Sequence, residues 1–69
     1  MSVTDQIASR VRQLRSDHGL TLGGLADKTG VSRSTISLIE RGETSPTAVV
    51  LERLSVGLGV PLASLFAMA

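Results

Sequence analysis

Apolar residues recur at helical spacing along most of the chain, in stretches that are separated by glycines. In the first stretch, Ile7, Val11 and Leu14 follow one another at intervals of four and three residues, which predicts a helix from about Thr4 to Asp17 with one apolar stripe. A left-handed residue commonly ends a helix, and the glycines placed just after such stretches are Gly19, Gly30, Gly42 and Gly57/Gly59. The pattern therefore predicts an all-α fold of five short helices, without strands.

Two of the predicted helices lie close together in the middle of the chain. Positions 22, 25 and 26 are apolar and predict a helix over Leu22 to Thr29, with Thr21 as its N-cap. Ser32 caps the next helix, which covers residues 32–41 and stops at Gly42. Two short helices joined by a glycine-containing turn are typical of a helix-turn-helix, here over about residues 21–41.

Two further helices are predicted in the C-terminal third. Thr47 is the expected N-cap of the fourth helix, because Pro46 restricts the backbone just before it. Apolar residues at positions 48, 50, 51, 54 and 58 form the inner face of this helix. Pro61 suits a first helical position, so the last helix is expected from Pro61 to about Ala67. Gly57 and Gly59 are interpreted as the stop between these two helices.

With 69 residues, the chain can bury one small core, so a single domain over residues 1–69 is expected. The absence of cysteine excludes disulfides and thiolate metal sites, the single histidine cannot form a zinc site alone, and no cofactor is indicated. No apolar run reaches the roughly 18 residues that span a bilayer, and no signal peptide pattern is present, which predicts a soluble cytoplasmic protein without a membrane partner. The net charge of +1 does not by itself indicate a nucleic-acid partner. Six of the seven basic residues are arginines, whose planar guanidinium group suits phosphate and guanine recognition.

A helix turns about 100° per residue, which places Ile36 and Ile39 on one side of the helix over 32–41 and Arg33 and Arg41 on the other. In a helix-turn-helix the second helix reads base edges in the major groove. The side chains expected to read bases on this polar face are Arg33, Ser34, Ser37 and Leu38. Arginine bonds bidentately to guanine, small hydroxyls allow close approach and leucine contacts a thymine methyl. Arg33 is the leading candidate, while both serines can bond a phosphate instead.

Phosphate contacts are expected from two helix starts and from the loop that follows residues 32–41. Exposed amides and hydroxyls at such positions bind anions, although an ordinary polar loop explains the same residues equally well. The residues expected to bind phosphates are Thr21, Leu22, Ser32, Arg41, Thr44, Ser45 and Thr47.

Residues 4–66 resemble the lambda-repressor/Cro family, the xenobiotic-response-element type of bacterial regulator. The resemblance rests on the segments RVRQLRSDHGLTLGGLADKTGVSRSTISLIERGETSP and LGVPLASLF, which follow the family pattern in order and spacing. It implies a five-helix bundle and a transcriptional regulator of the repressor type, which binds a near-palindromic operator as a homodimer in the bacterial cytoplasm, associated with the nucleoid when bound. It also implies base contacts from the four residues named above and an internal ion pair between Arg15 and Glu40.

The chain departs from the family at Leu22, where many members carry a glutamine that contacts a phosphate and a neighbouring base reader. Only the backbone amide at Leu22, with Thr21, can substitute for that side chain. Gly23 and Gly24 replace polar helix formers, and glycine inside a helix costs about 1 kcal/mol relative to alanine, so weaker anchoring is expected. A ligand-sensing domain, which relatives often carry after this region, is absent from these 69 residues.

An enzyme and a protein-interaction module are the two alternatives to a DNA-binding function. Ser16, Asp17 and His18 are the only catalytic-type trio, but consecutive helical residues point in different directions, so no enzyme is predicted. A helix-turn-helix used for protein interaction, as in an antitoxin or a bridging coactivator, stays open because the charge is near neutral and the glutamine is missing. Apolar residues in excess of one small core also predict a dimer interface formed by Leu58, Val60, Leu62 and Phe66, with Leu65 nearby.

Overall fold

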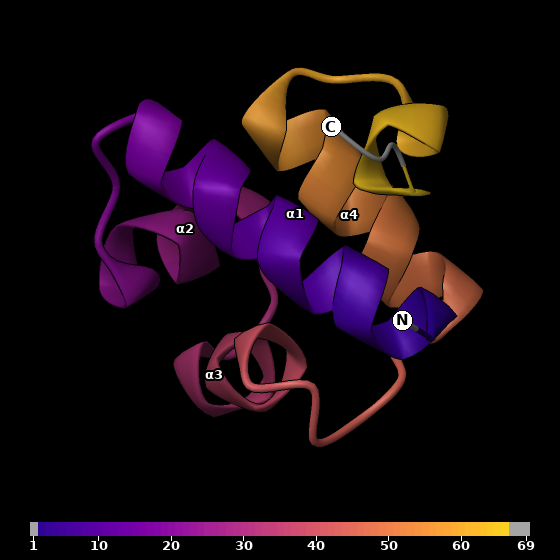
Figure 1. Ribbon diagram of the computed structural model, residues 1–69. Coiled ribbons are helices and arrows are strands. Elements are labelled where there is room, and N and C mark those ends of the chain that lie inside the picture. Colours follow the sequence, from indigo (N-terminus) through magenta and orange to yellow (C-terminus); the bar gives the residue numbers. More distant parts are fainter. Residues whose placement is uncertain (1, 67–69) are drawn as a thin grey trace.

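The backbone of residues 2–66, the part described by this computed structural model, forms four α-helices and a short 3-10 helix (Figure 1). In chain order the elements are α1 (Val3–Asp17), α2 (Leu22–Thr29), α3 (Arg33–Glu40), α4 (Ala48–Leu58) and η1 (Leu62–Phe66). Because residues 2–66 contain no strand, the predicted all-α class is confirmed. The predicted motif over 21–41 contains α2, the connecting residues 30–32 and α3.

The prediction of an α-helix for the last element is wrong. An α-helix was expected from Pro61 to about Ala67, but Leu62–Phe66 forms a 3-10 helix, in which the amide of Ser64 donates to the carbonyl of Pro61 at 2.9 Å. Gly59, at φ 66°, ends α4 just before it and leaves only a short segment. Short helical pieces commonly adopt the tighter 3-10 form. Ala67 lies outside the described residues.

Each α-helix begins after a hydroxyl side chain that accepts a hydrogen bond from the amide three residues later. The four N-caps are Ser2, Thr21, Ser32 and Thr47, with oxygen to nitrogen distances of 2.9 to 3.2 Å. Such a bond satisfies one of the amide donors that a helix start leaves unpaired. The three predicted caps are confirmed, whereas α1 begins at Val3 instead of about Thr4 because Ser2 caps it.

The core lies where the apolar stripe of α1 meets the inner faces of the other helices. In Figure 1, α1 crosses the bundle, with α3 at the lower edge of the view and α2 at the left. α1 packs against α3, α4 and η1, and α2 packs against α3 and α4. The buried core residues are Ile7, Val11, Leu14, Leu25, Val31, Ile36, Ile39, Leu54, Leu58 and Leu65. This arrangement supports α3 on its inner side only.

Gly57 is part of the α2–α4 packing and is not the helix stop that the sequence suggested. It lies inside α4, and Gly59 alone ends that helix. A Cβ atom at Gly57 would overlap Cγ2 of Thr29 and come within 3.3 Å of the carbonyl of Lys28. The Thr29 side chain cannot easily rotate away, because its hydroxyl donates to Leu25 O at 2.8 Å and accepts from Val31 N at 3.2 Å.

We therefore expect Gly57→Ala to destabilise the fold. Overpacking a core costs about 1 to 3 kcal/mol, and the higher helix propensity of alanine offsets about 1 kcal/mol of this, so we expect a net loss of up to about 2 kcal/mol in the free energy of unfolding, measured in urea. Gly23→Ala is the matched control, since its Cβ would meet nothing closer than Thr21 Oγ1 at 3.9 Å. The control should stabilise by up to about 1 kcal/mol. Equal stabilisation by both variants would contradict the proposed close packing at Gly57.

Candidate nucleic-acid interface

The outer side of α3 is a polar face that no other described element covers. Ile36 and Ile39 point into the core and are almost fully buried. Arg33, Ser34 and Leu38 are exposed on the other side. On the same face, Ser37 is half-buried, whereas Arg41, the C-cap of α3, is exposed. The structure therefore brings the four predicted base readers together on one helix, with Ser37 the least accessible.

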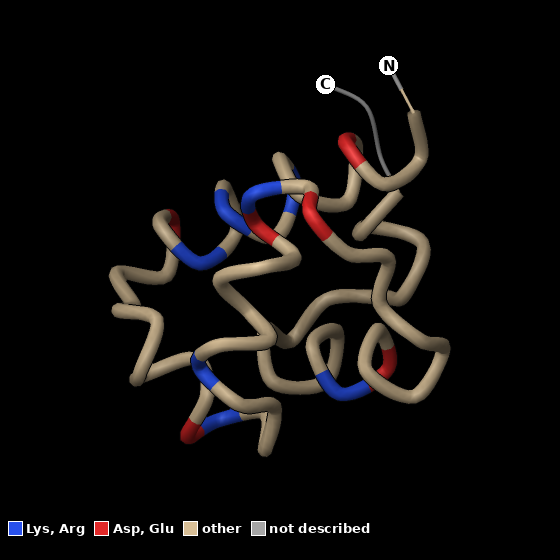
Figure 2. Tube along the Cα trace, turned by 90° about the horizontal axis from the view of Figure 1, so that it is seen from below, with Lys and Arg blue, Asp and Glu red and all other residues tan. Residues whose placement is uncertain are grey.

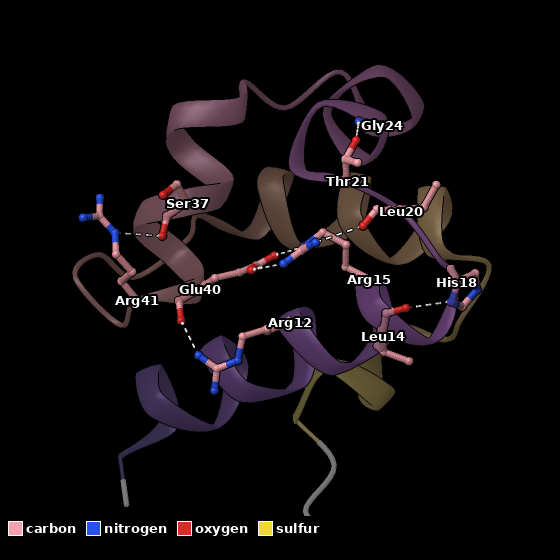
Figure 3. Close-up of polar contacts among 10 residues, drawn as sticks. All are labelled: Arg12, Leu14, Arg15, His18, Leu20, Thr21, Gly24, Ser37, Glu40 and Arg41. Atoms are coloured by element: carbon pink, nitrogen blue, oxygen red, sulfur yellow. Dashed lines mark hydrogen bonds and ion pairs between the residues drawn. The ribbon is translucent and has the colours of Figure 1, made fainter.

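The C-terminal end of α3 has a partner for each of its last four carbonyls. The amide of Arg41 donates to Ser37 at 3.1 Å, and the amides of Gly42 and Glu43 donate to Ile39 and Leu38 at 3.0 Å each. The carbonyl of Glu40 accepts from Nη1 of Arg12 in α1 at 3.3 Å (Figure 3). With Gly42 at φ 70°, the two loop amides form a Schellman ending. The C-terminal end of α3 is thus closed by its own loop and by α1.

An ion pair between the buried Glu40 and the partly buried Arg15 ties α3 to α1. Arg15 Nε lies 2.7 Å from Glu40 Oε2 and Nη2 lies 2.9 Å from Oε1, while Nη1 donates to the carbonyl of Leu20 at 2.9 Å (Figure 3). Glu40 is only 7% exposed. Hydrogen bonding to Glu40 raises the pKa of Arg15 above its ordinary value, against the opposing effect of burial. The pair expected from the family resemblance is therefore present, and it fixes the orientation of α3.

Arg12 is a contact that sequence reasoning missed. Its guanidinium reaches the carbonyl of Glu40, at the negative end of the α3 dipole, where a cation is favourable. The available signal was its position three residues before Arg15, which places both arginines on neighbouring parts of one α1 face.

The expected phosphate contacts lie at the starts of α2 and α3, where Ser32 is the exposed N-cap, and in the loop between α3 and α4. Thr21 is exposed and caps α2 through Gly24 N, whereas Leu22 is half-buried against the core. The first amides of a helix have no intrahelical partner, so the start of α2 can offer backbone donors. The space beside Gly23 is open, since a Cβ there would meet nothing closer than Thr21 Oγ1 at 3.9 Å, whereas a Cβ on Gly24 would come within 3.3 Å of the same atom.

The loop after α3 is held against the N-terminal part of α1. Ser45 Oγ lies 2.8 Å from Thr4 Oγ1. Among the other loop residues, Thr44 is half-buried and Thr47 is exposed, with its hydroxyl accepting from Val50 N at 3.2 Å. Arg41 Nε lies 3.0 Å from Glu43 Oε2. This loop begins at the C-terminal end of α3 and leads to α4.

The residues expected at a dimer interface do not share one surface. Leu58 is 2% exposed, so its side chain fills the core and is not accessible to a second copy. Val60 is half-buried against the same core, and Leu65 is fully buried. Leu62 and Phe66 are exposed on η1.

Charges of both signs are interspersed along the chain trace, as Figure 2 shows. In residues 2–66 no helix has the length and apolar character needed to cross a membrane. Over the same residues, no group of three or more His, Asp or Glu side chains is placed to hold a metal ion.

Comparison with known proteins places this geometry in a family. A family model described as a helix-turn-helix domain matches residues 6–66. The HTH-type transcriptional regulator SutR of Escherichia coli K12 is 40% identical over 58 residues, which cover 84% of this chain and 33% of SutR. An HTH_3 family transcriptional regulator from Vibrio cholerae has a TM-score of 0.89 at 39% identity, over 93% of this chain and 36% of that one. The chain therefore spans about a third of either protein.

A shorter solved relative is matched over nearly its whole length. The restriction-modification controller protein C.AhdI from Aeromonas hydrophila has a TM-score of 0.87 at 30% identity, over 91% of this chain and 96% of that one. The match to the family model includes α2, the turn, α3 and the loop that follows. The chain belongs to the helix-turn-helix transcriptional regulators of the lambda-repressor/Cro type.

Proposed function

We propose that this chain binds double-stranded DNA sequence-specifically, as the DNA-binding domain of a transcriptional repressor, with α3 in the major groove. The observation that carries the proposal is the outer face of α3. It exposes Arg33, Ser34 and Leu38 on a helix that is capped at both ends and anchored to α1 through Glu40. The family supports this reading, because its named relatives are transcriptional regulators.

In the proposed complex, Arg33 reads a guanine through its O6 and N7 atoms, and Leu38 contacts a thymine methyl. Ser34 bonds a base edge, and Ser37 does so from its half-buried position. Phosphates on either side are bound by the starts of α2 and α3 and by the loop after α3. The residues proposed for phosphate contacts are Thr21, Leu22 through its amide, Ser32, Arg41, Thr44, Ser45 and Thr47.

We further propose that two copies bind a near-palindromic operator, each placing α3 in one half-site. Half-sites read by such a dimer lie about 34 Å apart on one face of the duplex. The candidate dimer surface is reduced to Val60, Leu62 and Phe66, because Leu58 is buried.

A second candidate function is a protein-interaction module, and the surface of α4 favours it. Val49 and Val56 are 60% and 75% exposed, and they lie seven residues apart on one side of that helix. The net charge of +1 is small, so it favours a nucleic-acid partner no more than a protein partner.

Salt dependence of duplex binding distinguishes the two functions. Each phosphate neutralised by a cation contributes a slope of about −0.9 in a plot of log K against log salt. Arg41 is the one cation proposed to contact a phosphate, so the expected slope is about −0.9 for each protomer bound and about −1.8 for a dimer. Fluorescence anisotropy with a duplex selected from random sequences, between about 50 and 200 mM salt, measures it. Failure to select any duplex, or a slope near zero, would favour the protein-interaction module.

A further inference from the structure

Of the two arginines on the outer side of α3, Arg41 forms an ion pair within the described part of the chain and Arg33 does not. Arg41 Nε lies 3.0 Å from Glu43 Oε2, and it also donates to the carbonyl of Ser37 at 3.3 Å (Figure 3 shows the latter contact). Arg33 forms no ion pair within residues 2–66. One of the two cations proposed to face DNA is thus already engaged by an acidic side chain of the same protomer.

Backbone geometry holds Glu43 beside Arg41. The amide of Glu43 donates to Leu38 O at 3.0 Å, and Gly42 adopts φ 70°, which together form the ending of α3. A Cβ on Gly42 would come within 3.2 Å of Asp5 Oδ1, so the turn lies close against α1. The backbone of Glu43 is therefore held at the end of α3, and its carboxylate reaches Arg41 from there.

Both partners of this pair remain accessible to solvent. The side chains of Arg41 and Glu43 are 59% and 53% exposed, in contrast to the buried Arg15–Glu40 pair. Exposed pairs are worth about 0.2 to 1 kcal/mol, which is little enough for a phosphate to exchange with the carboxylate. A pair of this strength modulates binding without preventing it.

We propose that Glu43 is an internal competitor for DNA: it holds the Arg41 guanidinium in the free protein, and a backbone phosphate displaces it on binding. This inference rests on the proposed function. It assigns to Glu43 a role that the sequence did not suggest, namely lowering the affinity of the domain for any duplex. Because phosphates carry no sequence information, the penalty falls equally on operator and non-operator DNA.

Glu43→Gln should therefore tighten duplex binding by about 1.4- to fivefold, which corresponds to the range for an exposed pair. Selected and random-sequence duplexes should gain by the same factor. Glu52→Gln is the matched control: it removes one negative charge from α4, which packs against α2, α1 and η1, and brings the net charge from +1 to +2 as Glu43→Gln does. The control should leave the affinity almost unchanged.

A second background separates competition from simple charge repulsion. In an Arg41→Gln protein, Glu43 has no guanidinium to bind, so adding Glu43→Gln should not increase the duplex affinity further. A gain of the same size in that background would overturn the inference, because general repulsion between the carboxylate and DNA would then explain it. Equal affinities of Glu43→Gln and Glu52→Gln, or weaker binding by Glu43→Gln, would also overturn it.

A measurement without DNA keeps the two proposals distinguishable. The NMR signal of Arg41 Nε in the free protein should shift in Glu43→Gln and stay in place in Glu52→Gln. Absence of that shift would contradict the competitor role alone. If the wild-type protein selects no duplex at all, the proposed function fails, and the competitor role fails with it.

Discussion

Replacing Arg15 with methionine is expected to destabilise the fold by about 3 to 5 kcal/mol. The side chain binds both carboxylate oxygens of Glu40 and the carbonyl of Leu20, and its loss leaves a charged carboxylate at 7% exposure without its partner. Cores of this size rarely supply more than about 3 to 5 kcal/mol in total. We therefore expect Arg15→Met to be largely unfolded at room temperature, as measured by circular dichroism and urea titration.

Two variants test the reason for that loss. Arg41→Met breaks the exposed pair with Glu43 and should cost less than about 1 kcal/mol. In Arg15→Met/Glu40→Met the orphaned carboxylate is gone, and replacing both members of a buried pair by apolar groups is often nearly neutral. The double variant should thus recover most of the lost stability. A double variant no more stable than Arg15→Met would show that packing, and not the buried charge, causes the loss.

Arg33→Ala is expected to weaken recognition of one base pair while the fold remains intact. A bidentate arginine to guanine contact discriminates against other bases by about 1 to 3 kcal/mol, or about five- to 150-fold. Arg33 is exposed and contributes nothing to the core, so stability should hardly change. Binding measured on a panel of duplexes, each with one base pair of the selected site changed, should show one position at which the variant no longer discriminates.

Arg53→Ala is the matched control for this experiment, because it removes the same exposed charge from α4. It should preserve discrimination at every position of the site. If Arg33→Ala instead lowers affinity by one factor for all duplexes, Arg33 contacts a phosphate and another residue reads the base.

Much of the fold could be predicted because its boundaries are set by local chemistry. Thr21, Ser32 and Thr47 start their helices through hydrogen bonds to amides three residues away, and Gly30 ends α2 in the left-handed conformation. Such contacts depend on only a few neighbouring residues, so the sequence around them suffices. The bounds of α2 followed directly, and those of α3 differ from the predicted 32–41 only by its two caps.

Features that depend on distant parts of the chain could not be predicted in the same way. Gly57 resembled a helix stop, because the sequence does not show that Thr29 lies against it. The apolar pattern predicted Leu58 both on the inner face of the fourth helix and at a dimer interface, and the packing of α4 places it in the core. Apolar content alone does not distinguish a buried side chain from one at an interface.

The site was partly predictable for the same reason. Helical periodicity separates the outer face of α3 from Ile36 and Ile39, and this needs no tertiary information. The contacts of Arg12 with Glu40 and of Arg41 with Glu43 depend on how the helix end is closed, which only the folded chain shows. Glu43 was consequently missing from the predicted site.

The claim on which the functional account depends is that the outer face of α3 lies against base edges in the major groove. Methylation interference tests it most directly, because methyl groups on guanine N7 lie in the major groove and those on adenine N3 lie in the minor groove. With a selected duplex, N7 methylation of specific guanines should block wild-type binding, and one of these guanines in each half-site should lose its effect with Arg33→Ala. Binding that tolerates N7 methylation throughout the site would contradict the account.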